Sequence, residues 1–255
     1  MAMSENQKTI LITGATSGIG KASAELFAKQ NYRLIICGRR SDALEALKEE
    51  LKNQTEVHTL VFDVRDQQKV NEAFASLPES FSNIDILINN AGNAHGLATL
   101  SDGDVADWDA MIDGNVKGLL YVSKNVIPQM KQRGSGHIVN ISSVAARQTY
   151  ASGVVYCASK KAVDAISEGM RLELTEFGIK VSNIQPGAVE TDFSMVRFKG
   201  DQDRSDAVYA GYEALKAEDI ADAISYIVNA PKHVSIAEMT IYPQAQSEAR
   251  TIYRK

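Results

Sequence analysis

Short apolar runs recur along the chain, separated by longer stretches in which apolar residues return every three or four positions. The first pattern is typical of buried strands, and the second is typical of helices with one buried face. The predicted strands cover residues 9–14, 34–38, 57–64, 84–92 (ending in a loop), 136–142, 179–187 and 238–243. The predicted helices cover residues 19–29, 41–52, 67–77, 105–132, 154–177 and 217–229.

Strands and helices alternate throughout, and most of the strands are apolar on both faces. This pattern favours a parallel sheet that is covered by helices on both sides and joined by right-handed crossovers. No linker, repeat or low-complexity segment divides the sequence. We therefore predict the α/β class: a single doubly wound Rossmann domain over residues 1–255, with a seven-stranded parallel sheet flanked by helices.

Two regions are less regular. Gly114 and Gly118 interrupt the helix predicted over residues 105–132, and Pro128 is expected to bend its end. Residues 191–215 read as a loop with short helices, so we expect a substrate lid near residues 188–215.

The composition excludes several classes of protein. The 255 residues are 44% hydrophobic and 23% charged, close to an average soluble globular protein. The net charge is −5 without a basic patch, which argues against a nucleic-acid partner. No apolar run reaches the ~18 residues of a membrane span, and the start MAMSENQK lacks a signal-peptide core. Cys37 and Cys157 fit neither a disulfide nor a metal spacing, so we expect a cytoplasmic protein without a metal.

A glycine-rich turn follows the first predicted strand. It reads TGATSGIG over residues 13–20, with the spacing G-x-x-x-G-x-G. Such a turn lets backbone amides and a helix N-terminus approach a pyrophosphate. Three glycines in a loop are a weak signal alone, but this position makes the signal strong. The predicted phosphate-binding residues are Gly14, Thr16, Ser17, Gly18, Ile19 and Gly20.

The end of the second strand predicts which nucleotide binds. NAD sites usually carry an acid here, but this chain has Gly38 followed by Arg39 and Arg40. Two guanidiniums suit a 2′-phosphate, so we predict NADP, held mainly by Arg39 with Ser17 or Arg40 assisting. The alternative is a solvated loop with ordinary charges. Asp63, with Val64 beside it, is placed to accept from the adenine amino group; an ordinary turn cap would look the same.

The stretch YCASK places Tyr156 four residues before Lys160 in a predicted helix, so both side chains project from one face. The pair is either an ordinary surface pair or a phenol whose pKa is lowered by an ammonium for proton transfer. The pair alone does not decide between them.

Several motifs recur in one order, and together they resemble the short-chain dehydrogenase/reductase family. They are TGATSGIG, NNAG at 89–92, Asn115 in GNVKG, Ser143 in NISSVAA, YCASK and PG at 186–187. They span residues 8 to about 192. The resemblance implies that Tyr156 gives or takes the hydroxyl proton, and that Lys160 lowers the Tyr156 pKa and holds the nicotinamide ribose. Ser143, thirteen residues before Tyr156, would bind the substrate oxygen.

The resemblance also assigns supporting roles. Asn115 would hold a water that links Lys160 to solvent; alone, it would read as a polar break in a helix. The NNAG turn, with Asn89, Asn90, Ala91 and Gly92, would brace the sheet beside the cofactor. Pro186, Gly187, Val189 and Thr191 would line the nicotinamide.

The segments ETDFSMVRFKGD and MTIYPQAQS resemble the NADP-dependent 3-hydroxy acid dehydrogenase branch, which includes serine and L-allo-threonine dehydrogenases. A 3-hydroxy acid needs a cation for its carboxylate, and a guanidinium can bind it through two hydrogen bonds. Arg197, with Lys199 near it, and Arg147 are the candidates; each is equally explained as a surface charge. His95 is a further candidate, although a loop role explains it better.

The resulting hypothesis is reversible oxidation of a small 3-hydroxy acid by NADP+ in a homotetramer or homodimer. One alternative is a broad-specificity NADPH-dependent carbonyl reductase. The other is a non-catalytic NADPH-binding regulatory protein, which would not need the whole Asn115, Ser143, Tyr156 and Lys160 set.

Overall fold

The computed structural model describes residues 7–255, so most of the polar start MAMSENQK lies outside the described residues. Seven strands form one parallel sheet in the order β3-β2-β1-β4-β5-β6-β7. This confirms the predicted single Rossmann-like domain. The strands are β1 (Thr9–Thr13), β2 (Arg33–Gly38), β3 (Val57–Val61), β4 (Ile86–Asn89), β5 (Gly136–Ile141), β6 (Ile179–Pro186) and β7 (Glu238–Ile241).

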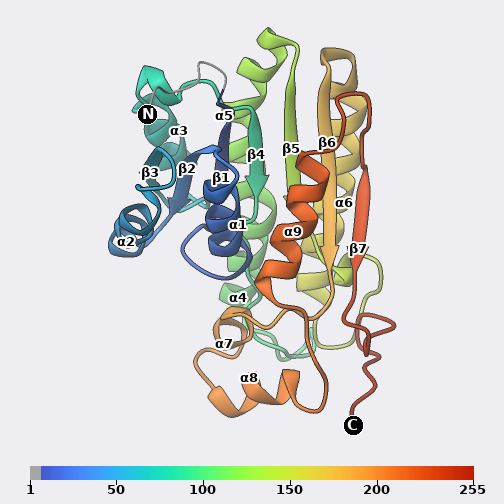
Figure 1. Ribbon diagram of the computed structural model, residues 1–255. Helices are drawn as coiled ribbons and strands as arrows, with labels where there is room; N and C mark the ends of the chain where they lie inside the picture. Colours follow the sequence, from blue (N-terminus) through green and yellow to red (C-terminus); the bar gives the residue numbers. More distant parts are fainter. Residues whose placement is uncertain (1–6) are drawn as a thin grey trace.

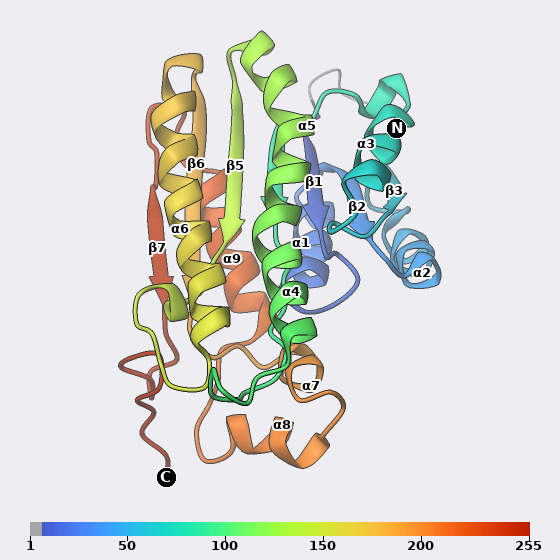
Figure 2. The ribbon, with the colours of Figure 1, turned by 180° about the vertical axis from the view of Figure 1, so that it is seen from behind.

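Helices cover both faces of the sheet (Figures 1 and 2). One face carries α1, α2 and α9, and the other carries α3, α4, α5 and α6. The α-helices are α1 (Gly18–Lys29), α2 (Ser41–Leu51), α3 (Gln67–Ala75), α4 (Val105–Ile112), α5 (Gly118–Arg133), α6 (Val154–Leu174), α7 (Phe193–Arg197), α8 (Gln202–Tyr209) and α9 (Ala217–Val228). Short helical turns are η1 (Glu79–Phe81), η2 (Asp113–Lys117), η3 (Val144–Ala146) and η4 (Thr175–Phe177).

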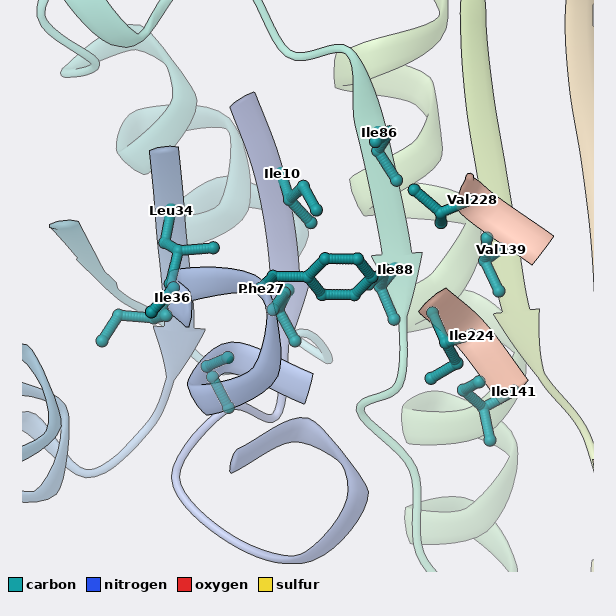
Figure 3. Packing of buried hydrophobic residues seen from close by; sticks show 14 of the residues in the cluster. Ile10, Phe27, Leu34, Ile36, Ile86, Ile88, Val139, Ile141, Ile224 and Val228 are labelled. Atoms are coloured by element: carbon teal, nitrogen blue, oxygen red, sulfur yellow. The ribbon is translucent and has the colours of Figure 1, made fainter. Parts of the chain in front are cut away.

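Apolar side chains of the central strands form a core on each face of the sheet. On the side of α1 and α9, Phe27 packs among strand residues such as Ile10 and Ile88, and Ile224 closes the cluster (Figure 3). Burial on both faces explains why these strands read as continuous apolar runs. The rigid sheet fixes the positions of the strand ends, where the loops carry the polar motifs.

The order of the strands places a crevice beside β1. The chain runs from β1 outward to β3 and then returns to β4 on the other side of β1. Ligands of doubly wound folds bind at such a switch point, at the carboxyl ends of the strands. The glycine-rich turn after β1 and the NNAG turn after β4 therefore meet at this crevice.

The predicted elements are all present, with differences at their ends and in one helix. The strand predicted over residues 57–64 ends at Val61, and the strand predicted over 84–92 covers only Ile86–Asn89. The helix predicted over 105–132 is divided into α4 and α5 by the π-helical turn η2, which contains Gly114. Pro128 lies within α5, and the helix continues to Arg133.

The segment after β6 forms a small layer across the carboxyl ends of the strands. Helices α7 and α8 lie together at this end of the molecule (Figure 1). The C-terminal tail holds α8 there, because the Arg254 guanidinium donates to the carbonyls of Ala207, Val208 and Ala210 at its C-terminus. Residues 193–209 thus have the short helices expected of the irregular region.

Candidate active site

A pocket of about 580 Å³ opens at the carboxyl ends of the strands, between the glycine-rich turn and the α7 segment. It brings together nearly all of the residues predicted to bind a cofactor. Its lining includes Gly14, Thr16, Ser17, Gly18, Ile19, Arg39, Arg40, Asp63, Val64, Asn90, Ala91, Gly92, Pro186, Gly187, Val189 and Thr191, and also Ser143, Tyr156 and Lys160; Gly20 and Asn115 lie just behind it.

Hydrogen bonds join the glycine-rich turn to the NNAG turn. Gly14 has φ +66°, and a Cβ on Gly20 would lie 2.3 Å from the Gly14 carbonyl oxygen, so neither position accepts a side chain without a shift. Asn90 Nδ2 donates to the carbonyls of Thr13 and Gly14, while Thr13 Oγ1 accepts from the amides of Asn90 and Ala91. The turn thus holds the N-terminus of α1 open toward the pocket, as an anion site requires.

Three guanidiniums surround the far end of the pocket, next to Gly38. Arg39 Nη1 lies 3.6 Å from Asp63 Oδ2, and Arg65 donates to both carboxylate oxygens of Asp63. Burial of Asp63 opposes its ionisation, but the Arg65 hydrogen bonds outweigh it and lower the Asp63 pKa. Arg40 Nη2 donates to Thr16 Oγ1 at 2.8 Å, linking this cluster to the phosphate turn.

Tyr156 and Lys160 lie on one face of α6, both buried, with 8% and 6% of their surfaces exposed. The Lys160 ammonium donates to the Ile141 carbonyl at 2.9 Å, which ties α6 to the end of β5. Ser143 follows β5 and lines the same pocket as Tyr156, and its Oγ accepts from the Ala145 amide at 3.1 Å. The three residues therefore converge, and the surface-pair interpretation of Tyr156 and Lys160 is wrong.

The expected lowering of the Tyr156 pKa is not found in the chain alone. Burial raises the pKa of the Tyr156 phenol, and Tyr150 adds to the increase, while the nearby Ser143 hydroxyl and Arg197 act in the opposite direction. Burial also lowers the pKa of Lys160 to about 8, against the attraction of Asp164. The physical reason is desolvation, which disfavours phenolate and ammonium alike, and the Lys160 ammonium bonds to a carbonyl rather than to the phenol.

Asn115 lies in the π-helical turn η2 and fixes the loop after β4. Its Oδ1 accepts from the Asn93 amide at 2.8 Å, and its Nδ2 donates to the Asn93 carbonyl and to Ser159 Oγ. A Cβ on Gly92 would lie 3.0 Å from Asn115 Oδ1 and 3.3 Å from Lys160 Nζ. Asn115 and Lys160 therefore meet at Gly92, where only a glycine leaves room for both.

Arg197, at the end of α7, lies beside Tyr156. Its guanidinium carbon is 5.5 Å from the centre of the Tyr156 ring, and Nη2 donates to the Tyr150 hydroxyl at 3.1 Å. Its backbone carbonyl accepts a 2.9 Å hydrogen bond from the Gly96 amide, and this bond connects α7 to the loop after β4. A cation is thereby held beside the position where a substrate would meet Tyr156.

Arg147 does not join this site. Its guanidinium pairs with Glu238 of β7 at 2.9 Å, and its side chain is 53% exposed. It lines neither the cofactor pocket nor the smaller pocket that holds Arg197 and Tyr156. The turn η3 carries the chain away from Ser143 toward β7 before Arg147 is reached. The expectation that Arg147 serves the substrate is therefore not supported by its position. His95 lies on the Arg197 side of Tyr156, and burial lowers its pKa.

Sequence reasoning missed several residues of the site. Arg65 and Phe193 line the pocket, and the Phe193 ring lies 5.7 Å from the Tyr156 ring. Tyr150 holds Arg197 but carries no motif. Arg65 lies two positions after Asp63 in the sequence, and this spacing is the signal that could have predicted a third guanidinium beside Asp63. Nothing in the local pattern marks Phe193 or Tyr150.

The structure of residues 7–255 also bears on metal binding and on membrane insertion. Within that range, no group of three or more His, Cys, Asp or Glu side chains has the arrangement of a metal site. Across the same part of the chain, no helix combines the length and apolar character that crossing a bilayer requires.

A dinucleotide-type fold whose pocket is lined by Ser143 and by the buried Tyr156 and Lys160 defines a nucleotide-dependent oxidoreductase. The chain belongs to the short chain dehydrogenase family, whose sequence profile matches residues 8–202.

Known proteins resemble it over nearly the whole length. Serine 3-dehydrogenase of Rhizobium radiobacter is 42% identical over 97% of this chain and 98% of its own. Sulfoacetaldehyde reductase 2 of Chromohalobacter salexigens is 43% identical over 93% of this chain and 95% of its own. The closed form of serine dehydrogenase complexed with NADP+ is a solved structure with a TM-score of 0.91 and 40% identity, covering 97% of this chain and 100% of that one.

Proposed function

We propose that this chain transfers hydride between NADP and the 3-hydroxyl carbon of a small 3-hydroxy acid such as serine or L-allo-threonine. The observation that carries the proposal is the Arg197 guanidinium over the Tyr156 ring, which places a carboxylate-binding cation next to a proton-transfer group. The resemblance to serine 3-dehydrogenase and to serine dehydrogenase with NADP+ supports it.

The pocket fits NADP by its size and its charges. Its volume of about 580 Å³ lies within the ~300–1,000 Å³ of typical cofactor sites. The open N-terminus of α1 suits the pyrophosphate, and Arg39 and Arg40 suit a 2′-phosphate. Gly38 leaves no acid there to repel it. When bound, NADP+ supplies the hydride acceptor and a positively charged ring.

Tyr156 is the group that moves the proton. In the oxidation direction its phenol oxygen takes the proton of the substrate hydroxyl, and in reduction its O–H returns that proton. The raised pKa keeps Tyr156 protonated in the chain alone, which suits it as an acid. Oxidation therefore needs added positive charge near Tyr156, of the kind that the oxidised cofactor brings.

Ser143 and Lys160 hold this chemistry in place. The Ser143 hydroxyl lines the pocket together with Tyr156 and would donate to the substrate oxygen. The Lys160 ammonium donates to the Ile141 carbonyl, and although burial lowers its pKa to about 8, Lys160 remains mostly protonated near neutral pH. Asn115 fixes the loop carrying Gly92, and Phe193 covers the Tyr156 ring and keeps water out.

The product of the oxidation is a 3-oxo acid, which can lose CO2 without help from the enzyme. Serine or L-allo-threonine would then give an aminoaldehyde or an aminoketone. The substrate carboxylate would form two hydrogen bonds with Arg197, which fixes the orientation of the hydroxyl toward Tyr156.

A second candidate is reduction of a small aldehyde that carries a sulfonate. Sulfoacetaldehyde reductase 2 is 43% identical, and Arg197 offers a sulfonate the same cation as a carboxylate. A broad carbonyl reductase would not need Arg197, and a non-catalytic sensor would not need the Ser143, Tyr156 and Lys160 set.

An absorbance assay at 340 nm separates these candidates. Turnover of L-serine, L-allo-threonine or 3-hydroxybutyrate with NADP+ supports the first, and NADPH-dependent reduction of sulfoacetaldehyde alone supports the second. Reduction of neutral ketones alone would favour the carbonyl reductase. Tight NADPH binding without any turnover would favour the sensor.

We also propose a cytoplasmic homotetramer with residues 188–215 acting as a lid. Cys37 and Cys157 are buried free thiols, which suits a reducing compartment. Leu120 on α5 and Leu172 on α6 are exposed, with 41% and 78% of their surfaces accessible, and would be covered by a second copy. Size-exclusion chromatography with light scattering tests the oligomer.

A further inference from the structure

One face of α6 carries a polar residue at every fourth position: Tyr156, Lys160 and Asp164. Side chains with this spacing share a helix face. Tyr156 and Lys160 have roles in the proposed reaction. Asp164, one turn further along, has none, although it is partly buried and surrounded by polar groups.

The Asp164 carboxylate accepts three hydrogen bonds. Oδ1 accepts from Ser142 Oγ at 2.7 Å and from Asn183 Nδ2 at 2.7 Å. Oδ2 accepts from Gln185 Nε2 at 3.0 Å. All three partners are donors, so the surroundings suit an ionised carboxylate, which only accepts.

These donors lie where the two strands enter the active site. Ser142 directly precedes Ser143, and its hydroxyl also lies 3.1 Å from the Lys160 carbonyl oxygen. Asn183 and Gln185 lie on β6, just before the Pro186 turn that lines the pocket. Asp164 therefore ties α6 to the ends of β5 and β6 at the level of the catalytic residues.

The negative charge of Asp164 also attracts the Lys160 ammonium. Among the described residues, it is the acid whose charge raises the pKa of the buried Lys160 ammonium. The other groups around that ammonium are uncharged: the Ile141 carbonyl at the end of β5, Gly92 after β4 and Asn115 in η2. Tyr156, one turn earlier on α6, is the remaining titratable neighbour.

We propose that Asp164 is a positioning residue for this reaction: it fixes Ser142, and through it the Ser143 hydroxyl, and its charge keeps Lys160 protonated. The kinetic part rests on the proposed function. The electrostatic part does not, because the charge of Lys160 can be followed without turnover.

The direct test is Asp164→Asn, which keeps the size, removes the charge and places an NH2 donor among three donors. We expect kcat to fall by about tenfold or more, because Ser143 is displaced. The alkaline limb of the kcat–pH profile should move down by about 1 pH unit, because Lys160 loses its proton more readily. Asp164→Glu should return the limb toward its original position. Glu168→Gln, at an exposed position one turn further along α6, is the matched control and should change neither.

The titration of Lys160 is measured independently by ¹³C NMR of protein labelled at the lysine Cε, with the signal assigned by its loss in Lys160→Arg. Its midpoint should be lower in Asp164→Asn than in the unchanged protein. If Asp164→Asn does not fold, Ser142→Ala replaces it and should lower kcat while leaving the midpoint in place.

An unchanged midpoint in Asp164→Asn would overturn the proposal, whether or not kcat falls, because a purely structural role predicts that result. If Ser142→Ala must be used, an unchanged kcat would overturn it. If the unchanged protein oxidises no hydroxy acid, the proposed function fails. A lowered midpoint would still support the electrostatic role of Asp164.

Discussion

The guanidinium of Arg197 lies 5.5 Å from the centre of the Tyr156 ring, and the Gly96 amide holds the residue there by donating to the Arg197 backbone carbonyl. The two residues come from different elements, α7 and α6, that are far apart in the sequence. A proton-transfer group and a fixed cation thus meet in a smaller pocket that adjoins the cofactor pocket at Tyr156. This relationship distinguishes an enzyme for anionic substrates from a general carbonyl reductase.

Replacing Arg197 should selectively harm the use of anionic substrates. Arg197→Met is expected to lower kcat/KM for a 3-hydroxy acid by about ten- to a hundredfold, the cost of losing a charge-assisted hydrogen bond. Reduction of a neutral ketone should change little. Arg147→Met is the matched control, because Arg147 pairs with Glu238 on the surface, and it should stay within about twofold. Equal losses in both variants, or for both substrate types, would remove Arg197 from substrate binding.

Tyr150 should act through Arg197. Its hydroxyl accepts the 3.1 Å hydrogen bond from Arg197 Nη2, so Tyr150→Phe leaves the ring and frees the guanidinium. We expect KM for the hydroxy acid to rise by about tenfold, since a hydrogen bond from a charged group is worth ~1.5 kcal/mol or more, with kcat for a neutral ketone unchanged. Steady-state kinetics with both substrates measure this. An unchanged KM for the acid would show that Arg197 keeps its position without Tyr150.

The choice of NADP should depend on Gly38 and Arg39. A Cβ on Gly38 would lie 3.4 Å from Thr16 Cγ2, an ordinary contact, so Gly38→Asp should fit the turn. Its carboxylate would repel a 2′-phosphate, and Arg39→Ala would remove a cation that attracts it. Each change is expected to lower the ratio of kcat/KM for NADP+ over NAD+ by about tenfold or more. Because NAD+ serves as the internal control, a fall for both cofactors together would indicate a damaged turn instead.

His137 should make the protein sensitive to acid. It is buried on β5, and burial lowers its pKa to about 4. Ser182 Oγ donates to the Ile236 carbonyl and so accepts from His137 Nε2, which leaves Nδ1 as the group that must take a proton. The unfolded chain binds that proton near pH ~6.5, so stability is full above this value and is lost as pH falls toward about 4.

Protonation of His137 should lower the free energy of unfolding by at most on the order of 3 kcal/mol. Urea unfolding at pH 7.5, 6 and 4.5 measures it, and His137→Gln, which keeps a donor for Ser182, should flatten that dependence. A parallel decline with pH in both proteins would assign the acid sensitivity to other groups.

The sequence was sufficient for the sheet and for most of the pocket, because both depend on local patterns. The apolar runs predict β1 to β7, and the order of the motifs brings Gly14, Asn90 and Tyr156 to the carboxyl ends of parallel strands. The division at η2 was only partly visible. Gly114 and Gly118 signal an interruption, but the π-helical turn arises from the packing that lets Asn115 reach Asn93 and Ser159.

The substrate side depends on tertiary contacts and was less predictable. Arg147 and Arg197 looked equivalent as charges, and only the path of η3 sends Arg147 to Glu238. The predicted lowering of the Tyr156 pKa is also not found, because burial of the phenol raises that pKa by more than the nearby cations lower it. Asp164 gave no signal, since its three donors come from β6 and the end of β5.

The central claim is tested most directly by following NADPH formation at 340 nm from NADP+ with L-serine, D-serine, L-allo-threonine, 3-hydroxybutyrate and 3-hydroxyisobutyrate, beside Tyr156→Phe. We predict turnover of at least one acid by the unchanged protein and a loss of about 10²–10⁴-fold in the variant, with NADPH binding retained. Turnover of neutral carbonyls but of no hydroxy acid, or undiminished turnover by Tyr156→Phe, would contradict the account.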